Sequence, residues 1–407
     1  MAGACALGYR TGVSAAECRT VVVVGSGPAG AATALSLLQR EPGLAGDVVL
    51  LERARHPRDK TCAGGLIPKT LSILEQLAVP FAVPNVRVDE AAVWVPGARV
   101  TVPGHDLCRV VRRCDFDAAL AWAARDRGAL LREDVTVRAL HREGDGIRVD
   151  TDRGSYRAQV VVGADGSGSL VRRRLLPAAT AEIARARMAD VPVTAAAWDG
   201  HARRRYEFDF RERGRGMRGY AWAFPCLVAG RPYANVGAYA LPPVDGEALE
   251  RALARQMARV GASTTGRQAF PIHAWTPGRP LAAPHVLLVG DAAGVDPLLG
   301  EGISYALEFG IAAAAAIVEA RRTGDWSFAG WTGEIASGPL GRKLTRLRQA
   351  AAAFYGPLGP VCFRAARASG RAQRLALDWY NGVAPWEGQG PVAALRALVR
   401  GAPAAAS

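Results

Sequence analysis

Continuous and alternating apolar runs divide the chain into segments of two kinds. The valines at 21–24 and the run at 47–51 contain no polar alternation, which predicts buried parallel strands. Between them an Ala/Leu-rich stretch predicts a helix that ends near residue 40, so the three segments form one β-α-β unit. A third continuous run at 285–289 predicts another buried strand, and a long helix is expected over about 301–322.

Other stretches alternate between apolar and polar positions. Residues 86–110 and 188–240 show this pattern, which predicts antiparallel strands. Further strands are expected near 131–139, 146–151 and 155–163, and helices near 68–78, 115–129 and 246–260. Because the two kinds of strand interleave, the sequence predicts an α/β fold with two lobes that the chain crosses more than once.

Each predicted lobe is assigned to residue ranges of the chain. A Rossmann-type lobe, three layers around a parallel sheet, is expected from 18–85, 111–180 and 285–325. An antiparallel-sheet substrate lobe is expected from 86–110 and 181–284, and residues 326–407 are expected to form a helical C-terminal region.

Composition narrows the class of protein. Half of the 407 residues are hydrophobic, and the net charge of +14 is carried almost wholly by arginine, since lysine occurs only at Lys60, Lys69 and Lys343. This charge favours an anionic partner such as a membrane surface or an acidic electron carrier, whereas no nucleic-acid motif is present. The seven cysteines form no CxxC pair, so we expect neither a disulfide framework nor a metal site.

The same features predict a cytoplasmic protein. Free cysteines are typical of a reducing compartment, and no signal peptide is expected. The longest apolar run, 310–320, is far shorter than a membrane span, so any membrane contact is expected to be peripheral, at the inner face. The basic tail at 342–379 leaves two interpretations open: such a contact, or helices that close the substrate lobe with arginines toward water.

A glycine motif lies between the first strand and the first helix. Gly25, Gly27 and Gly30 form GxGxxG, in which the backbone turns tightly, approaches a diphosphate and lets the helix pack on the strand. The helix N-terminus supplies N–H donors for the phosphates. Glu52 ends the second strand, 22 residues past Gly30, where an acid accepts from an unphosphorylated ribose. The motif therefore predicts FAD or NAD.

Two later turns favour FAD. Asp165–Gly166 and Gly290–Asp291 each follow a buried strand, where an aspartate can hold a ribitol hydroxyl. The helix start at Gly300–Gly302 can direct its positive potential at the N1–C2=O edge of a flavin and stabilise the reduced ring. Each aspartate taken alone is equally well explained as a helix N-cap.

These motifs resemble known families. GxGxxG, GADG (163–166) and GDAAGVDP (290–297) together resemble FAD enzymes built like para-hydroxybenzoate hydroxylase. Within that group, TCAGGLIP (61–68), RRCDFDAAL (112–120) and YAWAFP (220–225), with NVGAY after it, resemble the geranylgeranyl reductase family. The resemblance spans about residues 20–310, and it departs from the commonest loop at Ala63, where glycine often stands.

The resemblance implies a set of FAD contacts and a substrate wall. The implied FAD contacts are Gly25, Gly27, Pro28, Ala29, Gly30, Glu52, Arg53, Cys62, Ala63, Gly64, Arg113, Val137, Asp165, Gly166, Gly290, Asp291, Pro297, Gly300, Gly302 and Ile303. Tyr220, Trp222 and Phe224 share one face of a strand by alternation, as an isoprenoid-binding wall or simply as core.

The chemistry implied is hydride transfer from reduced flavin N5 to an isoprenoid double bond, plus a proton. Cys62 and Tyr220 are the candidate catalytic residues, with water as a third proton donor; Cys62 is equally well explained as a small residue packed by the flavin. Only one dinucleotide motif is present, so electrons are expected from transient NADPH or from reduced ferredoxin. The alternatives are a flavin monooxygenase or halogenase on an aromatic or polyketide substrate, and a non-catalytic flavoprotein.

Overall fold

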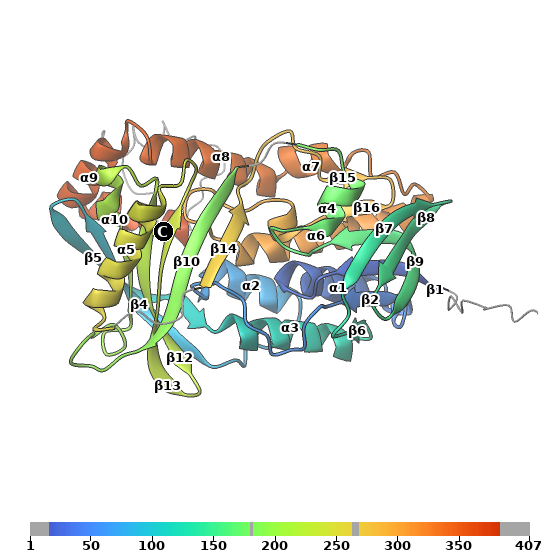
Figure 1. The fold of residues 1–407 in the computed structure, drawn as a ribbon, viewed down its shortest axis with the longest axis horizontal. Helices are drawn as coiled ribbons and strands as arrows, with labels where there is room; N and C mark the ends of the chain where they lie inside the picture. The colour runs from blue at the N-terminus through green and yellow to red at the C-terminus, as the bar shows by residue number, and fades with distance from the viewer. Residues whose placement is uncertain (1–15, 180–181, 263–267, 383–407) are drawn as a thin grey trace, which may run out of the picture.

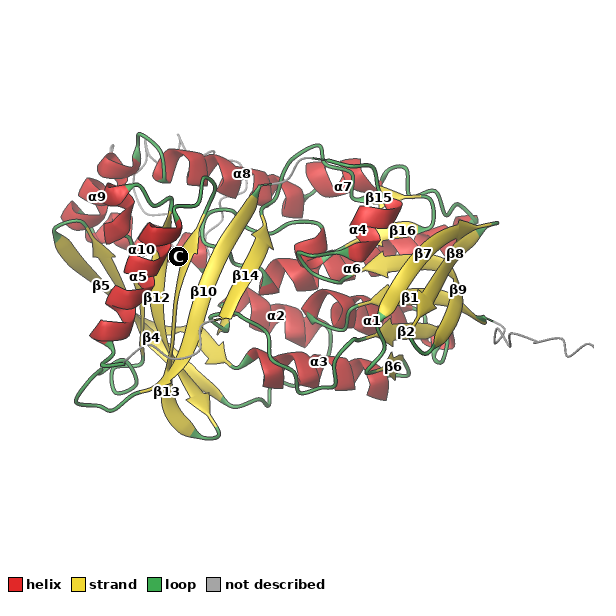
Figure 2. Cartoon of the chain, in the orientation of Figure 1, coloured by secondary structure: helices red, strands yellow, loops and turns green. Residues whose placement is uncertain are grey.

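The protein has two eight-stranded sheets, each at one end of an elongated molecule (Figure 1). The computed structural model describes residues 16–179, 182–262 and 268–382. Figure 2 shows helices beside both sheets, and the second sheet has helices on both of its faces. The chain passes between the two sheets several times, as the interleaved strand types predict.

The first sheet contains the predicted parallel strands. Its order is β15-β16-β9-β1-β2-β6, and β7 and β8 extend it as a hairpin on β9. The bounds are β1 Glu17–Val24, β2 Val48–Leu51, β6 Leu130–Arg132, β7 Val137–Glu143, β8 Gly146–Thr151, β9 Gly154–Gly163, β15 Ala282–Ala283 and β16 Val286–Leu288. The four valines of β1 are buried between β2 and β9, which explains the continuous apolar run.

The second sheet forms the predicted substrate lobe. Its order is β14-β10-β13-β12-β11-β4-β5-β3. The bounds are β3 Gly65–Leu66, β4 Asn85–Val95, β5 Ala98–Val111, β10 Ile183–Pro192, β11 Arg205–Asp209, β12 Gly219–Val228, β13 Arg231–Ala240 and β14 Gln268–His273. The expectation of antiparallel pairing is wrong for one described pair, since β4 and β11 run parallel. Over a hundred residues separate them, so no hairpin sets their direction.

Ten helices are described. They are α1 Pro28–Arg40, α2 Pro68–Gln76, α3 Arg113–Asp126, α4 Leu170–Leu175, α5 Gly246–Arg259, α6 Ile303–Thr323, α7 Trp331–Ser337, α8 Pro339–Phe354, α9 Gly359–Ala368 and α10 Gly370–Tyr380. Helix α5 covers one face of the second sheet with a small Ala-rich core, and α8, α9 and α10 lie over the opposite, aromatic face.

Helix α6 is longer than the apolar run suggests. Its 21 residues and mean hydropathy of 1.5 would suffice, by length and composition, to cross a membrane. However, 61% of its apolar window is buried inside the protein, and a Cβ at Gly310 would lie 2.6 Å from the Ala29 carbonyl oxygen of α1. This close packing is that of a core helix.

Candidate active site

In the GxGxxG turn, close packing requires glycine at two positions, whereas the third position has room for a Cβ. A Cβ at Gly25 would lie 2.4 Å from the Ala164 carbonyl oxygen, and one at Gly30 would lie 2.0 Å from that of Gly25. At Gly27 the nearest atom is 3.5 Å away, on Arg58. Gly27 is the N-cap of α1, and no side chain among the described residues caps this end. The open N-terminus therefore fits a diphosphate.

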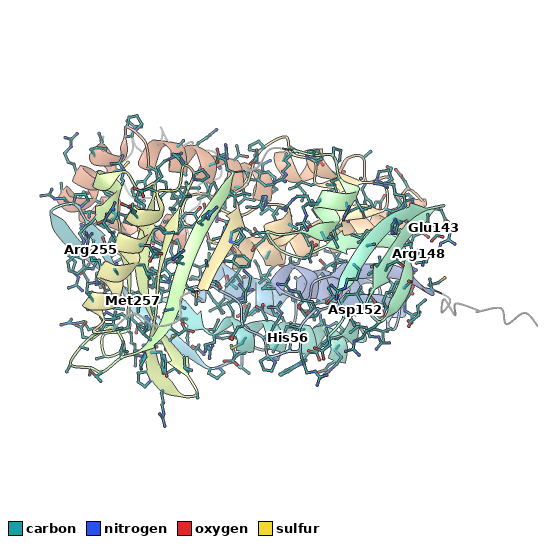
Figure 3. All side chains as sticks on the ribbon, in the orientation of Figure 1. His56, Glu143, Arg148, Asp152, Arg255 and Met257 are labelled. Atoms are coloured by element: carbon teal, nitrogen blue, oxygen red, sulfur yellow. The ribbon has the colours of Figure 1, made fainter. Side chains whose placement is uncertain are left out.

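Glu52 lies at the carboxyl end of β2, as predicted, and is buried. Its Oε2 accepts from the Ser26 hydroxyl at 3.0 Å and forms an ion pair with Arg58 Nε at 3.0 Å. Ser26 Oγ also lies 2.7 Å from Nε2 of His56 (Figure 3). Burial, with the charge of Arg58, lowers the pKa of His56, so this imidazole is a neutral partner.

Arg58 is a site residue that the sequence reasoning missed. Its NH1 group pairs with the buried Asp117 at 3.2 Å while its Nε holds Glu52, so the guanidinium lies beside the Gly27 turn. A cation there can neutralise a diphosphate. The only sequence signal is a basic residue in the loop after β2, in a chain where arginine is common everywhere.

Arg113 lies at the start of α3, where the resemblance places a cofactor contact. It donates two hydrogen bonds to Asp117, at 2.7 and 2.9 Å. Burial opposes its charge, but Asp117 and Cys62 outweigh this and raise the pKa of Arg113. Asp117 therefore orients both arginines, one toward the diphosphate turn and one toward the Cys62 loop.

The Cys62 loop is fixed against the second sheet. The Cys62 carbonyl accepts from Asn235 Nδ2 at 3.2 Å, and its backbone N–H lies 3.0 Å from the Met188 sulfur. Gly64 has φ +76°, and a Cβ there would lie 2.0 Å from the Val111 carbonyl oxygen. Ala63 is half-buried between them. The loop thus joins the two lobes, at the place where the resemblance puts the flavin ring.

Asp165 caps a helix in this structure. Its Oδ2 accepts from the backbone N–H groups of Leu170 and Val171 at 2.6 and 3.2 Å, while Oδ1 is buried with no partner among the described residues. Burial raises the pKa of Asp165. Ser169 occupies the N-cap position of α4, so Asp165 binds the first turn of this helix without being its N-cap residue. The contact of Asp165 with a ribitol hydroxyl stays a prediction.

Arg172 connects the two Asp–Gly turns and was not expected. It donates to the Ala292 carbonyl at 2.9 Å and to the Ser167 carbonyl at 2.7 Å. Asp291, next to Ala292, faces Lys60, with 4.0 Å between Oδ2 and Nζ. Burial lowers the pKa of Lys60, whose ammonium lies 3.3 Å from the Phe270 ring centroid.

Three tyrosine hydroxyls hold the loop that leads into α6. Tyr220 donates to the Leu299 carbonyl, Tyr239 to that of Pro297 at 3.2 Å, and Tyr355 to that of Leu298 at 2.6 Å. Burial raises the pKa of all three phenols. We call these residues the tyrosine clamp. Since the Tyr220 proton is used in this bond, the geometry favours a positioning role for it.

The α6 start itself fits an anion-stabilising helix end. Gly302 is the N-cap and Ile303 is the first helical residue, while a Cβ at Gly300 would lie 3.2 Å from the Tyr239 ring. The Glu301 carboxylate accepts from Ser304 N at 2.9 Å, so one N–H group of this helix end already has a partner. The flavin contact of Gly300, Gly302 and Ile303 stays a prediction.

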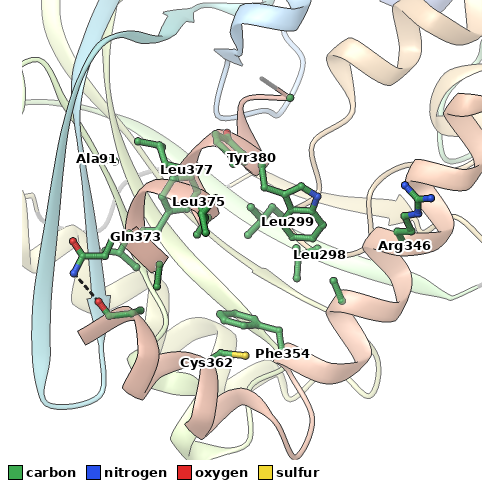
Figure 4. A pocket seen from close by; sticks show the side chains of 18 of the residues that line it. Ala91, Leu298, Leu299, Arg346, Phe354, Cys362, Gln373, Leu375, Leu377 and Tyr380 are labelled. Atoms are coloured by element: carbon green, nitrogen blue, oxygen red, sulfur yellow. Dashed lines mark hydrogen bonds between the residues drawn. The ribbon is translucent and has the colours of Figure 1, made fainter. Parts of the chain in front are cut away.

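The predicted aromatic wall lies behind a large apolar cavity. This cavity of about 1150 Å³ is lined by Tyr206 and Phe208 of β11, by Phe210 just after that strand, by valines of β4 and β5, by Leu298 and Leu299, and by α8–α10 (Figure 4). Tyr220, Trp222 and Phe224 are not among its lining residues. They pack on the rings that are, for example Tyr220 on Phe208 at 5.5 Å between centroids. Their substrate role stays a prediction.

The remaining predicted contacts surround the same turns. Pro28 and Ala29 are the first residues of α1, and Gly290 is packed on Ala29. Arg53 is exposed just past β2, and Val137 begins β7. Gly166 follows Asp165 with an open surface around it. The predicted FAD residues thus come from three chain segments that meet beside the first sheet.

Comparison with known proteins decides the family. The model of the FAD binding domain family matches residues 18–323. The chain belongs to this family of FAD-dependent oxidoreductases. The menaquinone reductase of Mycolicibacterium smegmatis is 31% identical to it over 72% of this chain and 75% of that protein. Digeranylgeranylglycerophospholipid reductase 2 of Methanosphaera stadtmanae is 28% identical over 75% of this chain and 79% of that protein.

Solved structures show the same fold. A geranylgeranyl bacteriochlorophyll reductase-like protein from Thermoplasma acidophilum superposes with a TM-score of 0.73 at 20% identity, covering 89% of this chain and 96% of that one. A flavin-dependent brominase superposes with a TM-score of 0.69 at 18% identity, covering 94% and 98%. The flavoprotein is therefore of the geranylgeranyl reductase and menaquinone reductase type, on a fold that halogenases share.

Proposed function

We propose that this flavoprotein reduces carbon–carbon double bonds in the isoprenoid chain of a hydrophobic lipid or quinone. The observation that carries the proposal is the apolar cavity, whose lining includes Leu298 and Leu299 of the loop that leads into α6. An isoprenoid chain has no polar atoms, so burial against valine, leucine and aromatic side chains supplies its affinity. The relatives named for menaquinone and for digeranylgeranylglycerophospholipid support this substrate class.

Reduced FAD, when bound, supplies the hydride at N5, and NADPH or reduced ferredoxin is the proposed electron source. The chain's own part is to hold the ring and the alkene. Arg58 and the α1 N-terminus bind the diphosphate, and the tyrosine clamp fixes the carbonyls before α6. Orientation of the alkene in the cavity supplies much of the rate, because an isolated alkene is a poor hydride acceptor.

The second hydrogen is a proton, and Cys62 is the proposed donor. Its thiol lies in the loop that joins the lobes, next to Arg113, and its Sγ accepts a long contact from Gly64 N at 3.4 Å. The Tyr220 hydroxyl, in contrast, already donates to the Leu299 carbonyl. We expect Cys62→Ser to keep FAD and lose turnover, whereas unchanged turnover would leave the proton to water.

Product mass tests the proposal. The reduced protein is incubated with geranylgeranyl-bearing lipids and prenyl quinones without oxygen, and the extract is analysed by mass spectrometry. Reduction adds two hydrogens per double bond and leaves the flavin oxidised. A product that gains one oxygen or a halogen, formed only when oxygen is admitted, would instead establish the monooxygenase or halogenase alternative.

A further inference from the structure

Four arginines form an exposed stripe on the two C-terminal helices. Arg364 and Arg367 lie three residues apart on α9, and Arg371 and Arg374 lie three residues apart on α10, so each pair shares a helix face. None of the four has a hydrogen bond or ion pair within the described residues. Some exposed arginines elsewhere pair, as Arg322 does with Glu319 at 2.6 Å, and those that do not pair lie dispersed over the surface. We call these four the arginine stripe.

The chain itself offers little charge to neutralise this stripe. Asp378 is the one acidic residue within α9 and α10. The segments outside the described residues contain a single acid, Glu387, and further arginines. A second copy of the protein would bring arginines against arginines. An external anionic partner is therefore what the charge distribution requires.

The other side of the same helices lines the apolar cavity. Phe363 and Leu375 face it, and Gln373 donates to the Ala366 carbonyl at 2.7 Å, which fixes α10 on α9 (Figure 4). Leu358, at the turn before α9, lines the cavity and is also 41% exposed. Exposed Pro357 and Pro360 flank it. The cavity thus reaches the surface at an apolar turn beside the arginine stripe.

We propose that the α9–α10 face docks on an anionic lipid bilayer, with the Leu358 turn in the interfacial layer. Arginines bind the lipid phosphates while the apolar turn enters between head groups, which is the composition of an interfacial helix pair. An acidic protein would neutralise the arginine stripe but would not bury the exposed apolar turn at Leu358. The further step, in which the docked turn admits a prenyl chain to the cavity, rests on the proposed function.

Vesicle sedimentation tests the docking with the FAD-loaded, full-length protein. The test variant is R364Q/R367Q/R371Q/R374Q. The control is R132Q/R174Q/R185Q/R231Q, four exposed arginines without a described side-chain partner that lie dispersed over the surface, so both variants have the same net charge. We expect wild type and control to bind vesicles of phosphatidylglycerol and phosphatidylcholine. The stripe variant should bind on the order of several hundredfold more weakly, since each of the four arginines contributes about fivefold.

The possible results distinguish an anionic bilayer from other binding partners of the α9–α10 face. Equal binding by stripe and control variants, or equal binding to pure phosphatidylcholine, overturns the proposal. Dimers that disappear in the stripe variant would assign the face to a second copy. A Leu358→Asp variant that binds like wild type would remove the apolar turn from the interface. Loss of vesicle binding with intact reduction of a detergent-dispersed prenyl lipid concerns the docking alone, whereas vesicle binding without reduction of any prenyl compound refutes only the proposed function.

Discussion

The candidate cofactor site and the proposed substrate cavity, at opposite ends of the molecule, are built in different physical ways. At the first sheet, the site is made of backbone: a tight glycine turn, an uncapped helix end and a carboxylate at a strand end. At the second sheet, the site is a space left between side chains of β4, β5, β11 and the C-terminal helices. Few sequences can form a site made of backbone groups, whereas many combinations of apolar side chains can line a cavity. The cofactor end is therefore specified by short motifs, and the substrate end is not.

The largest effect is expected at the diphosphate turn. Gly27→Val should abolish FAD binding, because its side chain would fill the approach of the phosphates, while the fold tolerates a Cβ there. The flavin absorbance of purified protein measures this, with circular dichroism to verify folding. Gly43→Val is the control, since nothing lies within 4 Å of that position. A yellow Gly27→Val protein would contradict the assignment of the turn.

A buried charge centre links the cofactor end to the Cys62 loop. Asp117→Ala should cost about 3–5 kcal/mol in the free energy of unfolding, because Arg113 would be left buried without its carboxylate. Denaturant unfolding measures it. Asp126→Ala, at the exposed end of α3, should change stability by less than about 0.5 kcal/mol. Equal losses of stability in the two variants would mean that Asp117 does not stabilise the buried charge of Arg113.

A bulky side chain in the cavity should lower substrate turnover without changing FAD binding. Ala366→Trp fills cavity space, so turnover of a geranylgeranyl substrate should fall at least about tenfold while FAD content stays unchanged. Ala368→Trp, exposed on the same helix and not lining the cavity, is the matched control. Steady-state kinetics and the flavin-to-protein ratio report the two effects. Full activity in the Ala366 variant would place the substrate elsewhere.

A tyrosine of the tyrosine clamp can be compared with a buried tyrosine that lines the cavity. Tyr355→Phe leaves the Leu298 carbonyl without its donor and should cost about 1–2 kcal/mol of stability. Tyr206→Phe should be neutral or stabilising, because the buried Tyr206 hydroxyl has no partner among the described residues. A shifted flavin reduction potential in the Tyr355 variant alone would show that the clamp positions the cofactor loop. Identical behaviour of the two variants would refute this.

The last prediction concerns the dependence of stability on pH. Burial raises the pKa of Asp296 from 3.8 to about 7. The folded protein holds this proton more tightly than the unfolded chain, so the stability gained is complete below about pH 4 and is lost as the pH rises through 7. Asp296→Asn cannot ionise, so its melting temperature should rise relative to wild type between about pH 5 and pH 8. A difference in melting temperature that does not change with pH would contradict the raised pKa of Asp296.

The sequence predicted the cofactor end in detail. The valines of β1, the GxGxxG turn and Glu52 lie where the periodicity and spacing place them, because each is a local consequence of strand and turn geometry. FAD rather than NAD followed from the later turns at 165–166 and 290–291, and the family from the resemblance of the segments at 61–68, 112–120 and 220–225. Both are confirmed by the comparisons. Arg58 and Arg172 were missed because their roles depend on contacts between segments far apart in sequence.

The substrate end shows where sequence reasoning stops. Alternation correctly placed Tyr220, Trp222 and Phe224 on one sheet face. The aromatic part of the cavity wall, however, comes from Tyr206 and Phe208 on the neighbouring strand and from Phe210 just after it. Register and neighbour order decide this, and neither is visible in a single strand's pattern. The exact segment boundaries and the assigned roles of the site residues remain predictions.

Flavin reoxidation in a single turnover tests the central claim most directly. The FAD-loaded protein is reduced without oxygen and mixed with a geranylgeranyl lipid, while the visible absorbance of the flavin is followed. We predict that oxidised flavin returns in proportion to the double bonds added, and that a saturated phytanyl lipid gives no change. Flavin that stays reduced with every prenyl compound and reoxidises only when oxygen is admitted would contradict the account.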